Sequence, residues 1–377
     1  MPNPRIHLVA GARPNFMKIA PLWHALTRAN AGFDTAIVHT GQHYDDEMSD
    51  VFLRQFKLPK PDYGLGCGGG SHAEQTAAVM TAYERVCLSD RPDWVIVVGD
   101  VNSTMATTVA AKKLLLRVAH LEAGLRSFDR TMPEEINRVV TDALADLLWT
   151  PSPDGDANLL REGVAPERIE LVGNIMIDAF EMLRGDIAAA RWPARHGLVE
   201  GEFAIATLHR PSNVDDPDRL AALVGTLVRI ARRLPVVLPL HPRTRLRLEE
   251  TGLLGSLKSA EGLCLTPPLG YVEFMSALTG ARFALTDSGG VQEESTYLGI
   301  PCLTLRDNTE RPITLSQGSN RLTKLESLER DVDDVLKGPR RIGARPALWD
   351  GATAARVVAS LIAHLSASRS SPVSGRG

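Results

Sequence analysis

Acidic side chains and histidines recur in this sequence where apolar segments end, and such groups can transfer protons. Asp100 follows the apolar segment Trp94–Val98, Glu122 follows the segment Arg117–Leu121, and His209 follows a third such segment. The carboxyl ends of strands in an open α/β sheet are where ligands bind. We therefore expect these groups to act as general acids and bases in a crevice. For Asp100 or Glu122 alone, a helix-cap or loop role is the alternative, but their occurrence at successive strand ends favours chemistry.

A glycine turn in the C-terminal half predicts a site for an anion. Phe283–Thr286 is a short apolar run that predicts a buried strand, and apolar residues at helical spacing begin at Val291. A turn between a strand and a helix aims free backbone N–H groups at an anion, and glycine lets the backbone approach it closely. The residues of this turn are Ser288, Gly289 and Gly290.

Two glutamates, Glu293 and Glu294, lie in the first turn of that predicted helix. A carboxylate can accept two hydrogen bonds from the vicinal hydroxyls of a ribose, which would suit a nucleotide. The alternative is that both glutamates only complement the positive end of the helix dipole. The two residues by themselves do not decide between these interpretations.

A second phosphate site is indicated near the N-terminus. Gly11 follows the predicted strand Arg5–Ala10, and the cations Arg13 and Lys18 lie close to the start of the next helix. Cations beside a helix N-terminus suit a phosphate, although a solvated basic loop is the alternative.

Glu134 has a complete structural explanation in the sequence. Thr131 and Glu134 have the spacing of a capping box, and Pro133 suits an early helical position. Glu134 is also four residues before Arg138, which predicts an ion pair on one helix face.

Composition excludes several classes of protein. The chain has 377 residues, with 42 basic and 45 acidic side chains and 5% aromatic residues, which argues against nucleic-acid binding. No apolar run approaches the roughly 20 residues of a membrane span, and the N-terminal apolar segment is too short for a signal peptide. We therefore expect a cytoplasmic protein.

Neither a metal site nor a nicotinamide site is predicted. The four cysteines form no CxxC pair, so no zinc site or disulfide framework is indicated. Residues 64–69 spell GxGxxG, but they follow KLPKPDY rather than an apolar strand. That motif indicates a dinucleotide only between a strand and a helix, so we interpret this segment as a Gly-rich loop.

Alternating strands and helices run through the chain and predict an α/β protein. The pattern divides near Gly173 into two doubly wound, Rossmann-like domains with an interdomain cleft. We expect domains at residues 1–172 and 173–352, a helix over about 353–366, and a disordered tail at 367–377. The Ala-, Arg- and Gly-rich segment Gly185–Gly201 is expected to be irregular.

The order of motifs resembles the non-hydrolysing UDP-N-acetylglucosamine 2-epimerases from about Ile6 to Leu365. Each matching segment is weak alone, but eight in the same order are highly specific. They are GARPNFMKIAPL (11–22), GQHYDDEM (41–48), VGDVNST (98–104), HLEAGLR (120–126), PEEINR (133–138), TLHR (207–210), DSGGVQEE (287–294) and ERP (310–312).

The resemblance implies a fold and a reaction. The fold would be GT-B-like, as in many nucleotide-sugar glycosyltransferases, usually dimeric, with the C-terminal helix returning to the first domain. A base would remove the proton from the second carbon of the sugar while UDP leaves, and UDP would add back after reprotonation on the other face. No cofactor and no metal are implied, and the product would serve surface polysaccharide synthesis.

Site residues follow from the resemblance position by position. The diphosphate would be held by the turn Ser288, Gly289 and Gly290 together with Arg13, and the ribose by Glu294. Arg311 would close on the nucleotide side, and Arg138 is expected to contact substrate. The residues expected to act around the sugar are Lys18, Asp100, Glu122, Glu134 and His209.

Some positions depart from the family pattern. Asn15 stands where Glu is common, Pro211 and Ser212 where Arg-Glu is common, and Asp45 where some bacterial members have Gln. In members that substrate activates, these positions line a second substrate site. A candidate effector site here comprises Gln42, Arg210 and His241, and the departures put activation in doubt more than catalysis.

Three alternatives remain open from the sequence. A relative that hydrolyses the intermediate would release N-acetylmannosamine and UDP. A glycosyltransferase of the same build would leave the three acids of the first domain unexplained. A binding module without turnover would not need Asp100, Glu122, Glu134 and His209 together.

Overall fold

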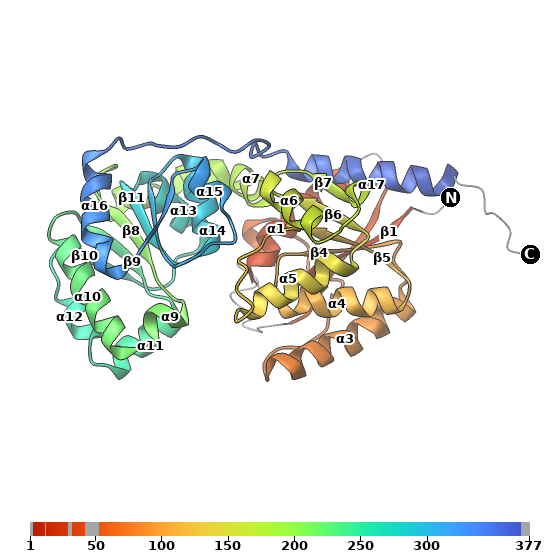
Figure 1. Ribbon diagram of the computed structural model, residues 1–377, viewed down its shortest axis with the longest axis horizontal. Coiled ribbons are helices and arrows are strands. Elements are labelled where there is room, and N and C mark those ends of the chain that lie inside the picture. Colours follow the sequence, from red (N-terminus) through yellow and green to blue (C-terminus); the bar gives the residue numbers. More distant parts are fainter. Residues whose placement is uncertain (1–2, 12, 29–31, 42–52, 371–377) are drawn as a thin grey trace, which may run out of the picture. The chain divides into compact units, whose positions relative to one another are not determined.

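The structure is a computed structural model that describes residues 3–11, 13–28, 32–41 and 53–370, with the backbone alone for Arg13 and 367–370. The chain divides into two compact units, Met1–Met182 with Ala347–Gly377, and Leu183–Pro346 (Figure 1). The expected domain boundary near Gly173 lies ahead of this division. The reason is that helix α7, Ile175–Ala190, runs from one unit into the other.

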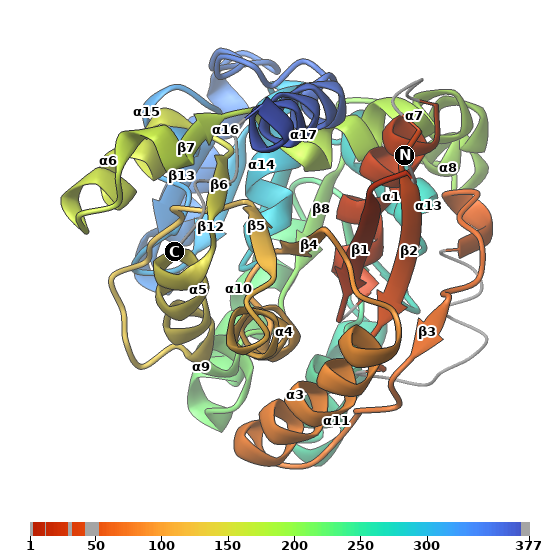
Figure 2. The ribbon, with the colours of Figure 1, turned by 90° about the vertical axis from the view of Figure 1, so that its right-hand side faces the viewer.

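Among its described residues, the first unit holds a parallel sheet of seven strands in the order β3-β2-β1-β4-β5-β6-β7. Figure 2 shows the strands fanned out in this order. The order reverses direction between β1 and β4, which is the switch point where open α/β sheets bind ligands. The strands are β1 (Arg5–Ala10), β2 (Asp34–His39), β3 (Tyr63–Gly64), β4 (Trp94–Val98), β5 (Arg117–Leu121), β6 (Leu147–Thr150) and β7 (Ile169–Leu171).

Helices cover both faces of this sheet, which is why β4 consists of five buried apolar residues. Helices α3, α4 and α5 lie on one face, whereas α1 and α17 lie together on the other (Figure 2). The helices of this unit are α1 (Arg13–Arg28), α3 (His72–Ser89), α4 (Asn102–Lys113), α5 (Pro133–Leu144), α6 (Pro153–Arg161), the first part of α7, and α17 (Thr353–Ser370).

The second unit repeats this architecture. Its described part contains a parallel sheet of six strands in the order β10-β9-β8-β11-β12-β13, with the switch point between β8 and β11. The strands are β8 (Ala204–Thr207), β9 (Val236–Pro239), β10 (Leu263–Thr266), β11 (Phe283–Thr286), β12 (Cys302–Leu305) and β13 (Asn320–Thr323).

A core of buried aliphatic side chains joins this sheet to its helices. Leu223 and Leu227 of α10 pack in one cluster with Leu285 of β11 and Leu303 of β12. The helices are α8 (Trp192–Arg195), α9 (Pro211–Val214), α10 (Pro217–Ala231), α11 (Pro242–Glu250), α12 (Leu254–Lys258), α13 (Tyr271–Gly280), α14 (Gly289–Leu298), α15 (Ile313–Ser316) and α16 (Leu328–Lys337).

The predicted α/β class with two parallel sheets is confirmed, and two local expectations are wrong. The segment Gly185–Gly201 is not irregular throughout, because α7 continues to Ala190 and α8 follows. Helix α17 extends to Ser370, so 367–370 are not a disordered tail; their Ala, Ser and Arg residues tolerate a helix, and residues 371–377 lie outside the described part. The edge strand β13 was not expected.

Within the described residues, no helix combines the length and the apolar character that crossing a bilayer requires.

Candidate functional site

Three strands of the first unit end side by side at the switch point. Val9 of β1 lies opposite Val97 of β4, which in turn lies opposite His120 of β5. The residues that follow β4 and β5, Gly99 and Glu122, therefore emerge at one edge of the sheet. This parallel register brings residues from distant parts of the sequence to a single place.

A buried ion pair occupies this edge. The Lys18 Nζ atom of α1 bonds to the Glu122 Oε2 atom, although the two residues are 104 positions apart. The side chains of Lys18 and Glu122 are 11% and 3% exposed. Asn15, which precedes Lys18 by one helical turn, donates a hydrogen bond of 3.2 Å to the Val98 carbonyl and accepts one of 3.1 Å from the Gly11 N–H. The Asn that departs from the family pattern thus ties α1 to β4.

Glu122 is held in an unusual state. Its φ angle is 74°, in the left-handed region that residues other than glycine rarely adopt. Its Oε1 atom is buried and has no hydrogen-bond partner among the described residues. A strained backbone and an unsatisfied buried oxygen both carry a free-energy cost, and both are typical of functional sites.

Asp100 is oriented by a second ion pair. Arg138 of α5, 2% exposed in its side chain, places Nη1 2.5 Å from the Asp100 Oδ2 atom. The same guanidinium places Nη2 2.6 Å from Glu135 Oε2. Glu135 also accepts hydrogen bonds from the backbone N–H groups of Ser127 and Phe128, at 3.0 and 2.8 Å. Glu135 therefore anchors the arginine that positions Asp100.

The structural explanation expected for Glu134 is wrong. Helix α5 has Met132 as its N-cap with no side-chain cap, because the Thr131 hydroxyl donates to Asp129 at 2.6 Å instead. Arg138 pairs with Glu135 and not with Glu134, which is exposed. The buried glutamate is Glu135, which the sequence did not single out. The exposed side chain of Glu134 remains available for another role.

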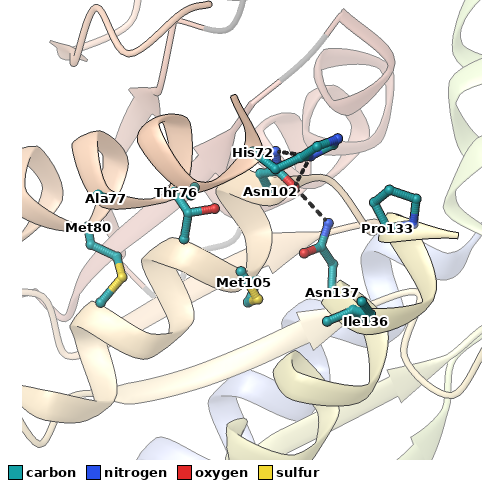
Figure 3. A pocket seen from close by; sticks show the side chains of 10 residues that line it. His72, Thr76, Ala77, Met80, Asn102, Met105, Pro133, Ile136 and Asn137 are labelled. Atoms are coloured by element: carbon teal, nitrogen blue, oxygen red, sulfur yellow. Dashed lines mark hydrogen bonds between the residues drawn. The ribbon is translucent and has the colours of Figure 1, made fainter. Parts of the chain in front are cut away.

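A pocket of about 410 Å³ lies on the helical face of the first unit. Helices α3, α4 and α5 line it, mostly with apolar side chains such as Met80, Met105 and Ile136 (Figure 3). At its polar end, Asn137 donates to the Asp100 carbonyl at 2.9 Å and to Asn102 Oδ1 at 3.2 Å. This pocket was not foreseen from the sequence.

In the second unit, the two glycines of the turn differ in the space around their α-carbons. A Cβ on Gly289 would lie 2.6 Å from Arg311 Nη1 and 2.8 Å from Glu310 Oε1, so a side chain there would have to displace this buried ion pair. A Cβ on Gly290 would meet nothing within 4 Å. Because Ser288 and Gly290 stand at the N-terminus of α14, the open space beside Gly290 suits an anion.

The Arg311 side chain packs against this turn, and its charge is paired with two glutamates. Its Nε atom is 2.8 Å from Glu293 Oε1, its Nη1 atom is 2.5 Å from Glu310 Oε1, and its side chain is 10% exposed. Burial would raise the pKa of Glu310, but Arg311 and Arg306 lower it below its usual value. The structure thus places Arg311 as a support for the turn.

Glu294 is a buried carboxyl group with altered acidity. Burial, opposed in part by Tyr271 and assisted by the nearby charge of Glu293, raises the pKa of Glu294 to about 8. A protonated carboxyl can both donate and accept a hydrogen bond, which a diol such as ribose could use. The sequence placed Glu294 correctly on the helix but gave no sign of its burial.

His209 is paired with Asp287, a carboxylate to which the sequence assigned no role of its own. The His209 Nδ1 atom lies 2.8 Å from Asp287 Oδ1, and Asp287 is fully buried. Asp287 also accepts the backbone N–H of Arg210 at 2.9 Å and Asn213 Nδ2 at 3.1 Å. Burial would raise the pKa of Asp287, but hydrogen bonding to His209 and these other donors lower it.

The other predicted residues are placed as follows. His241 caps α11, and its ring centroid is 5.2 Å from that of His209. Arg210 stands at the N-cap position of α9 without a side-chain cap, and it donates from Nε to the Asp287 carbonyl at 3.1 Å. The side chain of Arg13 and the whole of Gln42 and Asp45 lie outside the described residues. The described residues contain no group of three or more His, Cys, Asp or Glu that could hold a metal ion.

Comparisons with known proteins point to one family. A family model described as UDP-N-acetylglucosamine 2-epimerase matches residues 24–362. The chain is 41% identical over 344 residues to a UDP-N-acetylglucosamine 2-epimerase of Methanocaldococcus jannaschii, covering 89% of this chain and 93% of the relative. It is also 41% identical over 320 residues to a UDP-2,3-diacetamido-2,3-dideoxy-D-glucuronate 2-epimerase of Pseudomonas aeruginosa, covering 84% and 87%.

A solved structure extends this agreement to the fold. The crystal structure of the M. jannaschii UDP-GlcNAc 2-epimerase in complex with UDP-GlcNAc and UDP is similar to this chain, with a TM-score of 0.87 and 39% identity over 95% of this chain and 99% of that one. From the matched family model, the relatives and this structure we conclude that the chain belongs to the UDP-N-acetylglucosamine 2-epimerase family.

Proposed function

We propose that this protein interconverts UDP-N-acetylglucosamine and UDP-N-acetylmannosamine without hydrolysing them. The observation that carries the proposal is the buried Lys18–Glu122 pair at the switch point, with Glu122 strained and one of its oxygens unsatisfied. A buried carboxylate with a free oxygen is suited to exchange a proton with a substrate. Binding alone would not require it.

The reaction begins with an elimination. A base takes the proton from the second carbon, the electron pair of that C–H bond forms a double bond to the first carbon, and the bond from the first carbon to UDP breaks. UDP leaves with the electron pair of that bond. We assign the proton transfers to Asp100, after strand β4, and Glu122, after the adjacent strand β5, because each is oriented by a cation.

Re-addition completes the inversion. A proton is delivered to the second carbon on the opposite face, and the UDP oxygen bonds again to the first carbon. Glu134 and His209 are further acid–base residues of the proposal. His209 is supported by its buried partner Asp287, and Glu134 by its exposure and lack of a capping role.

Departing UDP must be stabilised as its negative charge develops. We assign its diphosphate to the turn Ser288–Gly290 and to Arg13, and its ribose to Glu294. The open space beside Gly290 and the N-terminus of α14 support the first assignment. The raised pKa of Glu294 supports the second. Arg138 acts on the substrate through Asp100.

A product assay tests the proposal. Purified protein is incubated with UDP-N-acetylglucosamine, and nucleotide sugars and free sugars are separated by chromatography. The proposal expects a mixture of the two UDP-sugars. Free N-acetylmannosamine with equimolar UDP would show a hydrolysing enzyme. If UDP-N-acetylglucosamine is not converted but a UDP-diacetamido-glucuronate is, the enzyme has a different sugar specificity.

We further propose that the protein forms a homodimer, as family resemblance implies. The apolar pocket on α3, α4 and α5 supports a contact there, because Ile136 at its edge is 51% exposed. Ile136→Glu should then shift the mass measured by light scattering from dimer to monomer. Leu160→Glu is the control, because Leu160 of α6 is 49% exposed but lies outside the pocket. A monomeric wild type would refute the proposal.

A further inference from the structure

His120 is a fully buried histidine that the reaction described above does not use. It is the penultimate residue of β5. Its Nδ1 atom lies 2.6 Å from Asp142 Oδ1, and its Nε2 atom lies 2.9 Å from the Gly99 carbonyl oxygen. Because a carbonyl oxygen can only accept, Nε2 is the donor of that hydrogen bond.

Asp142 holds the imidazole from the side away from Gly99. It also accepts hydrogen bonds from the Gly124 N–H at 3.0 Å and from Arg126 Nη1 at 2.7 Å. Arg126 in turn forms an ion pair of 2.7 Å with Glu162. Burial would raise the pKa of Asp142, but His120 and Arg126 lower it. The ring of His120 is thus anchored through a network that reaches α5 and α6.

Gly99 is the residue that this network reaches. It has a φ angle of 68°, and its N–H donates to the Leu121 carbonyl at 3.2 Å. A Cβ at Gly99 would lie 2.9 Å from Lys18 Nζ and 3.6 Å from Glu122 Oε2, so this backbone packs directly against the ion pair. The next residue is Asp100. The position of the Gly99 backbone therefore affects both Asp100 and Glu122. Strand β5 holds this backbone through the Leu121 carbonyl, which accepts from the Gly99 N–H, and through His120, which donates to the Gly99 carbonyl.

We propose that His120 is a positioning residue for the reaction. It touches none of the groups assigned to proton transfer, and it acts by holding the Gly99 carbonyl, which keeps Asp100 and the Lys18–Glu122 pair in place. This inference rests on the proposed function for its catalytic meaning. A misplacement of catalytic groups by about 1 Å can lower turnover ~100-fold. Accurate positioning therefore gives the buried hydrogen-bond network around His120 a function.

Two substitutions separate positioning from stability. In His120→Gln, the amide nitrogen takes approximately the place of Nε2 and can still donate to the Gly99 carbonyl. In His120→Asn, the shorter amide takes the place of Nδ1, so it can reach Asp142 but not Gly99. Each variant keeps one of the two hydrogen bonds, which makes them matched controls for each other.

We expect His120→Asn to lower kcat for UDP-N-acetylglucosamine at least ~10-fold while KM changes less than about threefold, and His120→Gln to keep kcat within about threefold. The thermal unfolding midpoints of the two variants should be similar. Losses of kcat that are equal in both variants, or that follow their unfolding midpoints, would show a purely structural role and overturn the inference.

Amide hydrogen exchange gives a readout that does not depend on turnover. His120→Asn should speed exchange at residues 97–101 at least ~10-fold relative to His120→Gln. Equal protection in both variants would overturn the positioning role. A wild type that does not epimerise but shows this difference in exchange would refute the proposed function and leave the support of Gly99 by His120 standing.

Discussion

His209 and Asp287 form a histidine–carboxylate pair in which the Nδ1 atom of the imidazole lies 2.8 Å from a fully buried carboxylate oxygen. This contact fixes the orientation of the ring and requires a hydrogen on Nδ1, which leaves Nε2 as the atom able to take up or give a proton. The pair lies at the switch point of the second sheet, where β8 and β11 are neighbours.

Asp287→Asn should therefore lower kcat at least ~100-fold, because an amide stabilises the wrong tautomer of His209. The measurement is steady-state turnover, with circular dichroism to verify folding. Asp215→Asn is the control, because Asp215 pairs with Arg243 and Arg247 on the surface of the same unit. Equal activity of the Asp287→Asn variant and the control would remove His209 from the proposed mechanism.

Gly290→Val should weaken UDP binding at least tenfold, a loss of about 1.4 kcal/mol. The branched side chain would enter the open space beside Gly290, where the diphosphate is expected to bind. Calorimetric titration with UDP measures the change. Gly255→Val on helix α12 is the matched control, because a Cβ there also meets nothing within 4 Å. Unchanged affinity in the folded Gly290→Val variant would refute the assignment of the turn.

Glu294→Gln tests the buried carboxyl group through the pH dependence of stability. The pKa of Glu294 is raised to about 8, so between its ordinary value and pH 8 the folded protein retains a proton that the unfolded chain releases. Stability contributed by this group is present at low pH and is lost as the pH rises through that window, by up to about 1.4 kcal/mol per pH unit.

The neutral amide of the Glu294→Gln variant does not titrate, so the variant should gain stability relative to the wild type as the pH rises from about 5 to 8. Thermal unfolding midpoints of the variant and the wild type at both pH values measure the difference in stability between them. Glu249→Gln, at an exposed position of α11, should show no such widening. A constant gap for Glu294→Gln would mean that the carboxyl is ionised across this range.

Turnover from UDP-N-acetylmannosamine should need no added UDP-N-acetylglucosamine. Pro211 and Ser212 begin helix α9 and replace charged residues that are common in the family, and Asn15 is engaged by Gly11 and Val98. Progress curves recorded with and without a trace of UDP-N-acetylglucosamine provide the test. A lag that the trace abolishes would show that substrate activates this protein despite these replacements.

The sequence predicted the framework well because buried parallel strands leave a strong signal. The strands Arg5–Ala10, Trp94–Val98, Arg117–Leu121 and Phe283–Thr286 have the bounds expected from the sequence. The edge strand Asn320–Thr323 was missed because Leu322 is its only apolar residue, so it shows no continuous apolar run.

The candidate site was harder to predict because its contacts depend on sheet order. Lys18 and Glu122 were both expected near the substrate, but their pairing arises only because β1, β4 and β5 are neighbours. Asp287 carried no signal beyond its place after a strand.

The start of helix α5 was predicted one residue too early, and the wrong glutamate was given the structural role. With Thr131 as the expected N-cap, Glu134 would fold back onto the helix end. In the structure Met132 is the N-cap, and the buried partner of Arg138 is Glu135, which the Ser127 and Phe128 N–H groups hold in place. Sequence spacing alone could not decide this, since the competing bond from Thr131 to Asp129 depends on the conformation of the preceding loop.

The most direct test of the central claim follows the hydrogen at the second carbon of the sugar. With UDP-N-acetylglucosamine in deuterated water, NMR should show both epimers carrying deuterium at that carbon, because inversion by elimination takes the returning proton from solvent. Glu122→Gln and Asp100→Asn should each slow this exchange at least ~100-fold. Formation of the second epimer with the original hydrogen retained would contradict the account.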